Sequence, residues 1–357
     1  MAGADIDDDQ VDRTELAGIE QGRVGEWLAG NVPGLVGPVE FTLVAGGRSN
    51  LTYRVTDAAG GVYALRRPPT GGVLSTAHDM GREWLFLSAM APTDVPVPEP
   101  LAFCADVEVT GAQFYLMAFV DGLVLADAEA GLKLSPPARA AAGRNLVDVL
   151  VRLHALDPVA VGLGEIVRST GYVQRQLSRW HRQVHQSGAG DLALLDEVHD
   201  LLATRVPAQT SGIVHGDFRP GNMAFGPDGS VRAVFDWELA TSGDPLADLG
   251  YLVSTWAQPG EALGSIGLSP STAPGYPSRD ELVAHYAQSS GRDVSALPYF
   301  VAFNRWRSAC ILAGVNARYQ AGVMADDGYA AEAQERADQS ARLMAESRDE
   351  LRHSAQS

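Results

Sequence analysis

The residues most able to do chemistry lie between His215 and Asp236, in two short polar runs. The first run reads HGDFRPGNM and the second reads VFDWE. In the first run, Asn222 follows Asp217 by five positions, on a loop that leaves a short predicted strand. Asp236 ends a later predicted strand. A hairpin between the two runs would bring Asn222 and Asp236 side by side, with Asp217 nearby.

These residue types suit phosphoryl transfer to an alcohol. Such a reaction needs one carboxylate to orient and deprotonate the hydroxyl, and oxygen ligands for the Mg²⁺ that accompanies the ATP phosphates. The spacing of Asp217 and Asn222 matches the kinase catalytic loop, in which an Asp is followed five residues later by an Asn. The neighbouring His and Gly, and the apolar-Asp ending of the second run, make the pattern more specific. The sequence therefore indicates a kinase reaction with ATP and Mg²⁺ as cofactors.

Predicted strands dominate the first third of the chain. Glycine pairs and prolines separate short runs of β-forming residues, which is typical of an antiparallel sheet with tight turns. The predicted strands are 41–45, 51–56, 62–67, 101–104 and 114–120. One helix is predicted among them, at 78–91, from apolar residues near helical spacing.

The remainder of the chain is predicted to be mainly helical, with a small β insert that carries the polar runs. The predicted helices are 136–156, 172–186, 192–204, 245–256, 279–289, 297–319 and 330–351. The predicted strands of the insert are 213–215, 222–225 and 231–235. A small β-rich half thus precedes a large helical half, and the expected class is α+β.

The chain resembles the aminoglycoside phosphotransferase and choline kinase-like superfamily, which shares the protein-kinase fold. The resemblance rests on residues 215–222 and on the run VFDWELATSGDPLADL at 234–249. The second run is similar to the branch found as the N-terminal kinase-like domain of acyl-CoA dehydrogenase family members ten and eleven. The runs GGRSN at 46–50 and LRRPP at 65–69 also fit this branch, and the similarity covers about residues 30 to 350. It implies a protein-kinase-like two-lobed fold with a β-rich N-lobe and a mainly helical C-lobe.

The resemblance also implies roles for individual residues. Asp217 would be the catalytic base, and Asn222 and Asp236 would hold Mg²⁺. Arg66 would stand in the place of the strand-three lysine of kinases, with Glu83 on the following helix as its ion-pair partner. The other implied nucleotide-binding positions form the turn that covers the phosphates and the hinge that borders the adenine, namely Gly46, Gly47, Ser49, Asn50, Phe119 and Val120.

Two positions depart from the protein-kinase pattern. The phosphate turn at 46–50 lacks the full G-x-G-x-x-G, and Arg66 stands where kinases have lysine. Arginine keeps a permanent charge and can bind phosphate through two hydrogen bonds. We therefore expect Arg66 to serve the same purpose.

Several other polar residues are interpreted as structural. His215 is expected to support the loop that carries Asp217, and Asp248 to be a scaffold residue. Asp244 is expected to cap the helix that follows it. Cys104 and Cys310 lie far apart, without metal-ligand spacing, and are interpreted as small buried hydrophobic residues.

The predicted organisation has three parts. A solvated acidic tail is expected at 1–25, the N-lobe at 26–121 and the C-lobe at 122–357. Within the C-lobe, the segment 158–212 is longer than its counterpart in protein kinases. The resemblance implies that this insertion builds a substrate pocket.

Basic residues gather in that insertion and in later helices, which stands out in an acidic protein. They are Arg175, Arg179, His181, Arg182, His185, Arg305, Arg307 and Arg318. Arg175 and Arg179 are candidates to face an anionic substrate, such as a carboxylate or a CoA phosphate; the alternative is a solvated helix face. For Glu238, substrate contact and packing are both open.

The expected function is transfer of the γ-phosphate of ATP to a hydroxyl group of a small molecule. The similar branch points to hydroxy acids or hydroxyacyl-CoAs as acceptors. An aminoglycoside acceptor is one alternative. Because aminoglycosides are cationic, they would require an acidic pocket. A nucleotide-binding pseudokinase that regulates a partner is another. The presence of Asp217, Asn222 and Asp236 together favours the enzyme.

Composition narrows the remaining classes. The 357 residues are 46% hydrophobic and 20% charged, a normal globular balance that supplies a sizeable core. The net charge of -17 argues against general nucleic-acid binding, which needs a basic face. No signal peptide is recognised, and no apolar run approaches the ~20 residues that a membrane helix needs. A cytoplasmic location without a membrane partner is expected, and the oligomeric state is left open.

Overall fold

The computed structural model describes residues 16–45, 50–70, 79–167, 171–261, 269–322 and 333–353. Its contacts divide the chain into two compact units. The first unit comprises residues 1–84 and 99–119, and the second comprises residues 85–98 and 120–357. The predicted phosphate-turn residues Gly46, Gly47 and Ser49 lie outside the described residues, as does most of the predicted acidic tail.

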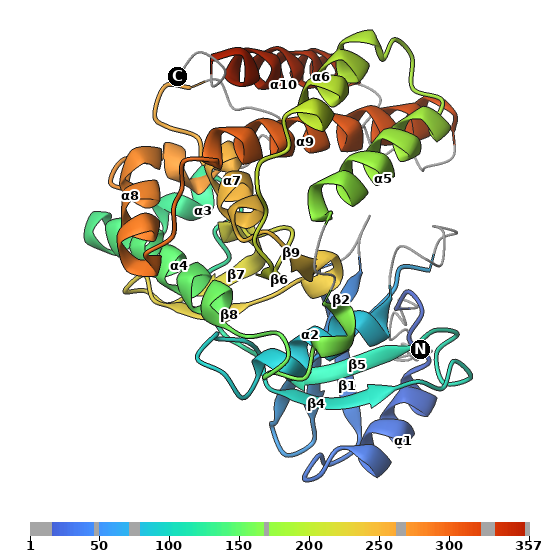
Figure 1. Ribbon diagram of the computed structural model, residues 1–357. Helices are drawn as coiled ribbons and strands as arrows, with labels where there is room; N and C mark the ends of the chain where they lie inside the picture. The colour runs from blue at the N-terminus through green and yellow to red at the C-terminus, as the bar shows by residue number, and fades with distance from the viewer. Residues whose placement is uncertain are drawn as a thin grey trace, which may run out of the picture. The chain divides into compact units, whose positions relative to one another are not determined.

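A five-stranded antiparallel sheet forms the centre of the first unit (Figure 1). Its strands are β1 (Val39–Ala45), β2 (Leu51–Asp57), β3 (Val62–Arg67), β4 (Pro100–Cys104) and β5 (Phe114–Ala118), in the spatial order β1-β2-β3-β5-β4. Helix α1 (Gln21–Asn31) begins inside the segment predicted as a tail and buries Val24 and Leu28 in the core of this unit. Helix α2 (Met80–Met90) starts in the first unit and ends in the second.

The β2–β3 turn sets which arginine of β3 faces which side of the sheet. Asp57 accepts hydrogen bonds from the backbone N–H groups of Ala59 and Gly61, and fixes a tight turn. Because successive side chains on a strand point to opposite faces, Arg66 and Arg67 diverge. Arg67 is buried and donates to the Thr110 carbonyl, so the other arginine, Arg66, is left for the opposite face.

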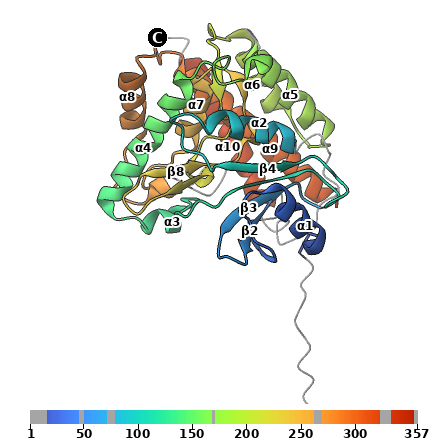
Figure 2. The same cartoon turned by 90° about the horizontal axis from the view of Figure 1, so that it is seen from below.

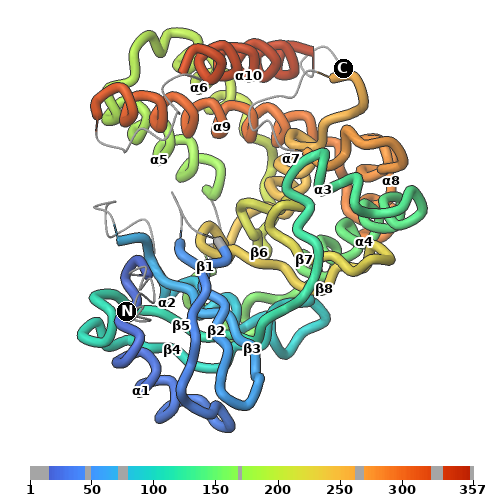
Figure 3. Tube along the Cα trace, turned by 180° about the vertical axis from the view of Figure 1, so that it is seen from behind, coloured from blue at the N-terminus to red at the C-terminus, as the bar shows by residue number. Residues whose placement is uncertain are grey.

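Helices build most of the second unit (Figure 3). They are α3 (Ala128–Leu132), α4 (Pro136–Ala155), α5 (Tyr172–Gln186), α6 (Ala193–Thr204), α7 (Leu246–Thr255), α8 (Arg279–Ser290), α9 (Leu297–Gln320) and α10 (Ala333–His353). The short 3₁₀ helices found in the described residues are η1 (Gly164–Ile166), η2 (Pro220–Asn222), η3 (Trp237–Leu239) and η4 (Pro270–Thr272). Two two-stranded sheets complete the unit: β6 (Gly212–Val214) with β9 (Thr241–Gly243), and β7 (Met223–Phe225) with β8 (Val231–Val234).

Side-chain caps fix where helices α4 and α8 begin. Ser135 accepts from the Ala138 N–H ahead of α4, and Ser278 forms a reciprocal capping box with Glu281 at the start of α8. The two helices pack together, and Figure 2 shows them along one side of the second unit. Gly143 of α4 permits this approach, because a Cβ there would lie 2.4 Å from the Pro277 ring.

The expected α+β class is confirmed, and the predicted helices and strands are found within a few residues of their predicted bounds. Strand β9, which reads Thr-Ser-Gly, was not predicted because it lacks the apolar β-forming residues that indicated β6 and β7. Helix α3 and the 3₁₀ helices were also not predicted, because helices of three to five residues are too short to show helical periodicity. Both cysteines are free and buried, as expected. In the described ranges, no helix is both long and apolar enough to cross a membrane.

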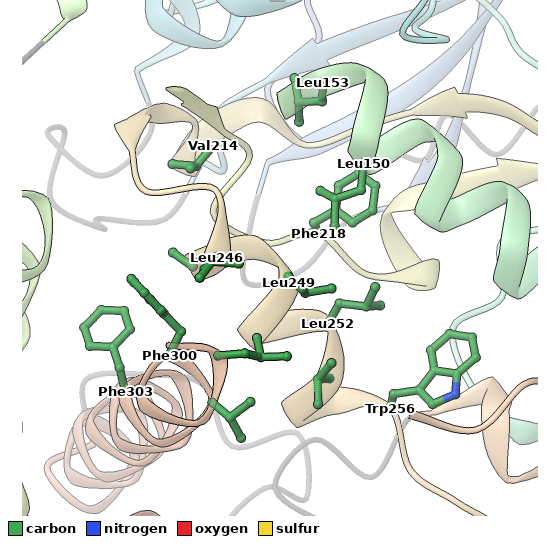
Figure 4. Close-up of a cluster of buried hydrophobic side chains, with 14 of the residues drawn as sticks. Leu150, Leu153, Val214, Phe218, Leu246, Leu249, Leu252, Trp256, Phe300 and Phe303 are labelled. Carbon is green, nitrogen blue, oxygen red and sulfur yellow. The ribbon is translucent and has the colours of Figure 1, made fainter. Parts of the chain in front are cut away.

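A continuous apolar core lies under the polar runs of the second unit (Figure 4). It collects side chains from α4, α7 and α9, including Leu150, Leu249 and Phe300. Phe218, which follows Asp217, is fully buried in the same cluster. The loop that carries Asp217 is therefore anchored in the core by its next residue.

Replacing Gly250 by Ala is expected to destabilise the protein by about 1–3 kcal/mol, because it overpacks the contact of α7 with α9. A Cβ at this position would lie 2.8 Å from the Phe300 carbonyl carbon and 2.9 Å from its oxygen. Backbone atoms cannot swing aside as a flexible side chain does. Denaturant unfolding of the purified variant measures the loss.

The matched control is Gly314→Ala, on α9 itself. Its Cβ would meet nothing closer than Ser187, at 3.8 Å, which is an ordinary contact. That change should be neutral or stabilise the protein by up to about 1 kcal/mol, as Gly-to-Ala changes in open helix interiors do. Equal effects of the two substitutions would contradict the packing argument.

Candidate active site

Two short sheets, β6–β9 and β7–β8, bring together the two polar runs, 215–223 and 234–238. Strand β6 ends at Val214, directly before His215, and pairs with β9. The β7–β8 hairpin pairs Met223 with Val234, so the residues just outside this pair are adjacent. The Phe235 N–H donates to the Asn222 carbonyl at 2.8 Å. The hairpin predicted from the sequence thus places Asp236 one residue beyond this hydrogen bond to Asn222.

The Asn222 side chain is locked onto Asp217. Its Nδ2 group donates to the Asp217 carbonyl at 2.9 Å and to Asp217 Oδ2 at 2.7 Å. Both partners are acceptors, so the hydrogen-bond network assigns the nitrogen to this side of the amide. Consequently Asn222 Oδ1, the atom that a cation would need, points away from Asp217.

His215 connects the two polar runs through its two ring nitrogens. Nδ1 accepts from the backbone N–H of Asp217 at 3.2 Å, and Nε2 donates to the Phe235 carbonyl at 2.8 Å. One acceptor and one donor are the pattern of a neutral imidazole with its proton on Nε2. Both nitrogens are engaged by backbone, which supports the structural role expected for His215.

Asp236 has a backbone conformation that residues other than glycine adopt uncommonly. Its φ of 65° and ψ of 63° lie in the left-handed region, and it is the one non-glycine residue with positive φ in the described part of the chain. Such strain costs of order 1–3 kcal/mol and gathers at functional sites. The next residue, Trp237, is buried against His215 and Phe86 and holds the strained turn in place.

The oxygen atoms of this region fit a magnesium ion. Asn222 offers an amide oxygen, and Asp236 offers a carboxylate that is neither fully buried nor fully exposed. Magnesium prefers such hard oxygen ligands, usually one or two from the protein with the rest from water and substrate phosphates. We therefore regard Asn222 and Asp236 as able to hold the ion that the sequence predicted.

A buried carboxylate fixes the backbone of the loop that carries Asp217. Asp248 of α7 accepts the His215 N–H on Oδ2 at 2.6 Å and the Gly216 N–H on Oδ1 at 2.8 Å. His154 of α4 contacts Oδ2 through Nε2 at 3.3 Å, and its Nδ1 lies 2.8 Å from the Tyr286 hydroxyl. The loop is thus tied to α4, α7 and α8.

The pKa of Asp248 reflects these contacts. Burial alone would raise the pKa of Asp248, but the hydrogen bonds from His154 and from the His215 N–H hold it below its usual range. The carboxylate is therefore charged at neutral pH and able to accept all three hydrogen bonds. The sequence indicated a scaffold role for Asp248 but not these partners.

Gly216→Ala is expected to lower turnover more than it lowers stability. Gly216 has a φ of 84°, and a Cβ there would lie 2.7 Å from the Leu239 carbonyl oxygen. Relief of that clash has to move either Leu239 or the N–H that donates to Asp248, and both changes displace Asp217. The expected results are a loss of about 1–3 kcal/mol in unfolding free energy and a larger proportional loss in kcat.

Gly260→Ala separates the two causes. Gly260 has nearly the same φ, 85°, but a Cβ added there would meet nothing within 4 Å. Gly260→Ala therefore forces alanine into a positive φ without creating a clash. The unfolding free energy of this variant should fall, and its kcat should not. If Gly216→Ala behaved like Gly260→Ala in both measurements, the positioning argument would fail.

Three further side chains lie around the loop that carries Asp217, and the sequence analysis gave none of them a role there. Arg219 Nε lies 3.5 Å from Asp217 Oδ2, and the Tyr251 hydroxyl is hydrogen-bonded to Asp217. Arg307 of α9 donates to the Gly216 carbonyl at 2.8 Å and stacks over the Tyr251 ring at 4.7 Å. Burial, and then the charge of Asp217, raise the pKa of Tyr251, so its hydroxyl stays a donor. Asp217 is therefore contacted by donor groups of Asn222, Arg219 and Tyr251.

The sequence contains a different clue to each of these three residues. Arg219 lies inside the polar run, two positions after Asp217, and its position was the available clue. Tyr251 follows Asp248 by three positions, which places both on one face of α7. Arg307 was noted only as one of the basic residues of the later helices; it is buried and donates to the Gly216 carbonyl.

The first unit brings together three predicted nucleotide-binding residues. Arg66 Nε lies 2.8 Å from Glu83 Oε1, and Asn50 Nδ2 donates to Glu83 Oε2 at 3.2 Å. Glu83 is fully buried and the Arg66 side chain is 11% exposed. A guanidinium held by a buried carboxylate is a fixed cation, which suits a phosphate ligand.

The predicted hinge coincides with the division of the chain. Phe119 closes the first unit and Val120 opens the second. Both side chains are partly buried, and Arg54 of β2 lies 4.9 Å from the Phe119 ring centroid. Their predicted part in adenine binding stays a prediction.

The predicted basic cluster is dispersed. Arg305 pairs with Glu346 and Glu350 of α10, and is therefore neutralised. Arg175 and Arg179 remain together on α5, one turn apart, with Arg175 partly buried and Arg179 exposed. Glu238 lies on η3, partly buried.

Asp244 has the structural role expected for it. Its Oδ1 accepts from the Leu246 N–H at the start of α7, and its Oδ2 accepts from the Thr210 N–H at 2.7 Å. The carboxylate thus satisfies a helix-start N–H group and ties α7 to the strand-bearing segment before β6.

Comparison with known proteins identifies a family and related sequences. The phosphotransferase enzyme family matches residues 40–282. Acyl-CoA dehydrogenase family member 11 of Gallus gallus is 34% identical over 316 residues, which cover 85% of this chain and 40% of that protein. Member 10 of Mus musculus is 32% identical over 291 residues, covering 80% of this chain and 27% of that protein. This chain thus spans two fifths or less of the length of these relatives, and the predicted resemblance is confirmed.

Solved structures give the same fold. A Ralstonia eutropha JMP134 protein, provisionally assigned as an aminoglycoside phosphotransferase, is 29% identical with a TM-score of 0.77, covering 93% of this chain and 98% of that one. An amicoumacin kinase solved with AMP-PNP and Ca²⁺ is 17% identical with a TM-score of 0.58, covering 93% and 94%. The expected kinase-like fold, with a five-stranded N-terminal sheet and a helical C-terminal part, is confirmed.

Proposed function

Because the chain belongs to the phosphotransferase enzyme family, we propose that it is a small-molecule kinase that transfers the γ-phosphate of ATP to a hydroxyl group. The observation that carries the proposal is the coupling of Asp217 to Asn222 through Nδ2. In this proposal, that contact would leave the Asp217 carboxylate for the acceptor and the Asn222 amide oxygen for the metal. Solved relatives that bind a nucleotide analogue with a divalent cation support the choice of cofactors.

In this proposal, bound Mg-ATP supplies the phosphoryl group and the cation that neutralises its developing charge. Asp217 accepts the proton of the acceptor hydroxyl and orients its oxygen for in-line attack. Asn222 and Asp236 would hold the metal through oxygen atoms. Their fixed geometry means that most of the rate gain comes from positioning and electrostatics.

The nucleotide-anchoring role falls to the first unit. Arg66 is held by Glu83 and presents a permanent charge to the phosphates. Asn50 shares the same carboxylate and fixes its orientation. Gly46, Gly47 and Ser49 would cover the phosphates with backbone N–H groups, and Phe119 with Val120 would border the adenine.

For the acceptor, we propose a hydroxy acid or a hydroxyacyl-CoA. The relatives named as acyl-CoA dehydrogenase family members support this class, since such enzymes act on acyl-CoA esters. The cations Arg175 and Arg179 on α5 also suit an anionic acceptor. The structural neighbour assigned to aminoglycoside phosphorylation favours a second candidate, a cationic aminoglycoside.

Transfer of labelled γ-phosphate from Mg-ATP to a panel of acceptors tests the function. The panel holds hydroxy acids, hydroxyacyl-CoAs and aminoglycosides, and Asp217→Asn is the control. Transfer to one class that the variant loses would support the kinase and identify the acceptor class. Nucleotide binding without transfer to any acceptor would count against it and favour a regulatory pseudokinase.

Replacing Arg175 and Arg179 together by Ala should raise the KM for an anionic acceptor by about tenfold or more, since each loses a charge-assisted contact. The KM for ATP and the kcat should stay close to those of the unmodified protein. Arg144→Ala, an exposed arginine on α4, is the control and should change neither. An unchanged acceptor KM in the double variant would sink the anionic-acceptor idea while leaving the kinase proposal intact.

A further inference from the structure

Away from the residues assigned above, two histidines of α5 and an aspartate of α6 converge on one point. His181 Nε2 lies 2.9 Å from Asp196 Oδ1, and His185 Nε2 lies 2.8 Å from the same oxygen. The three ligand atoms lie within 4.8 Å of one another. Among the residues that the structure describes, this is the one convergence of at least three histidine, cysteine or carboxylate groups.

Helix geometry explains the convergence. His181 and His185 are four positions apart on α5, so their rings lie one above the other on one face. Asp196 lies in the first turn of α6, which packs beside α5 (Figure 1). All three ligands therefore stand on regular helices rather than on loops, which fixes their positions.

The ligand set selects the class of metal. Two imidazole nitrogens with one carboxylate oxygen suit zinc and its transition-metal neighbours, whereas magnesium and calcium prefer oxygen alone. Ligand atoms on one tetrahedral zinc ion stand about 3.4 Å apart, given metal–ligand bonds of about 2.1 Å. The present spacings of 2.9 Å and 2.8 Å need a small side-chain rotation to admit an ion.

We propose that His181, His185 and Asp196 form a binding site for a divalent transition-metal ion, of which zinc fits best. Water would complete the four ligands, because the site is open: His181 is 32% exposed and Asp196 is 42% exposed. His199 of α6 supports it from the side, with its ring centroid 4.2 Å from that of His181. A bound ion would join α5 to α6 and hold the helix that carries Arg175 and Arg179.

Zinc titration of the tag-free full chain, stripped with a chelator and followed by calorimetry, tests the site. One equivalent of zinc should bind, and Mg²⁺ should not compete. His181→Ala, His185→Ala and Asp196→Asn should each weaken zinc binding by at least about tenfold. Asp236→Asn should leave this binding event unchanged, which separates the site from the proposed magnesium ligands.

His285→Ala is the matched control. His285 Nε2 lies 2.7 Å from Asp148 Oδ1, so it forms the same histidine–carboxylate contact with a single histidine, and it is similarly exposed. Zinc affinity should be unchanged in this variant. An equal loss in His285→Ala and His185→Ala would show nonspecific histidine binding and overturn the proposal.

Melting temperatures distinguish a loss of zinc binding from a loss of folding. The three ligands are surface residues, so the metal-free variants should melt close to the unmodified protein. Zinc should raise the melting temperature of the unmodified protein and of His285→Ala by mass action, and not that of the ligand variants. Absence of zinc binding by the unmodified chain at micromolar concentrations, or binding that survives all three ligand substitutions, would refute the site.

Discussion

Asp217→Asn should lower kcat by about 100- to 10,000-fold while leaving the affinity for nucleotide close to that of the unmodified protein. The amide oxygen of the new residue can still accept from Asn222 Nδ2, so the contact that orients Asn222 is kept. What disappears is the ability to accept a proton from the acceptor hydroxyl. Arg66, Glu83 and the proposed metal ligands Asn222 and Asp236 are unchanged, which is why nucleotide binding should persist.

Steady-state phosphate transfer and nucleotide titration of the same preparation measure the two effects. Asp280→Asn, an exposed aspartate at the start of α8, is the control and should retain full turnover. If Asp217→Asn kept kcat within about tenfold of the unmodified protein, Asp217 would not be the base. If nucleotide affinity collapsed as well, the substitution would have disturbed the loop rather than the chemistry.

Asp248→Asn should destabilise the second unit by about 3 kcal/mol or more. The two carboxylate oxygens accept from two different backbone N–H groups, those of His215 and Gly216. An amide has one oxygen, so it must turn an N–H donor toward one of these donors. The result is a buried unsatisfied N–H and a repulsive contact in a residue that is 1% exposed.

Chemical denaturation at several pH values measures this effect. Because the pKa of Asp248 is lower in the folded protein than in the unfolded chain, its contribution is fully present above the unfolded pKa of about 4. The contribution is lost as the pH falls through the folded pKa. The stability difference between the unmodified protein and Asp248→Asn should therefore shrink on acidification below about pH 4.

Asp280→Asn is again the control, because an exposed aspartate should change the unfolding free energy by less than about 0.5 kcal/mol at neutral pH. A similarly small change for Asp248→Asn would mean that the loop does not depend on the carboxylate. A difference that grew on acidification would contradict the direction of the pKa shift.

The sequence predicted those features that depend on neighbours along the chain. Helix α5 was predicted with its observed bounds, Tyr172–Gln186, because its apolar residues repeat at helical spacing across the whole segment. The approach of Asn222 to Asp236 was predicted because a short hairpin has few ways to close. Local pattern and local geometry sufficed in both cases.

Features that depend on distant partners were not predictable in the same way. Nothing along the chain indicates that Asp248 meets His154, 94 positions earlier, or that Arg307 donates to Gly216. The positive φ of Asp236 was also hidden, because asparagine or glycine would be the usual sign of that conformation. The pairing of Arg305 with Glu346 was not predictable either, because a sequence shows a charge and not its partner.

The hydrogen bonds around Asp248 also bear on the order in which parts of the fold form. The backbone N–H groups of His215 and Gly216 find their acceptor only after α7 has docked, and His154 with Tyr286 joins residues 132 positions apart. Closing such long loops comes late in folding, because their entropy must be lost before the contact is gained. Partly folded chains are therefore expected to lack the hydrogen bonds that hold the Asp217 loop, even where the β7–β8 hairpin has already formed.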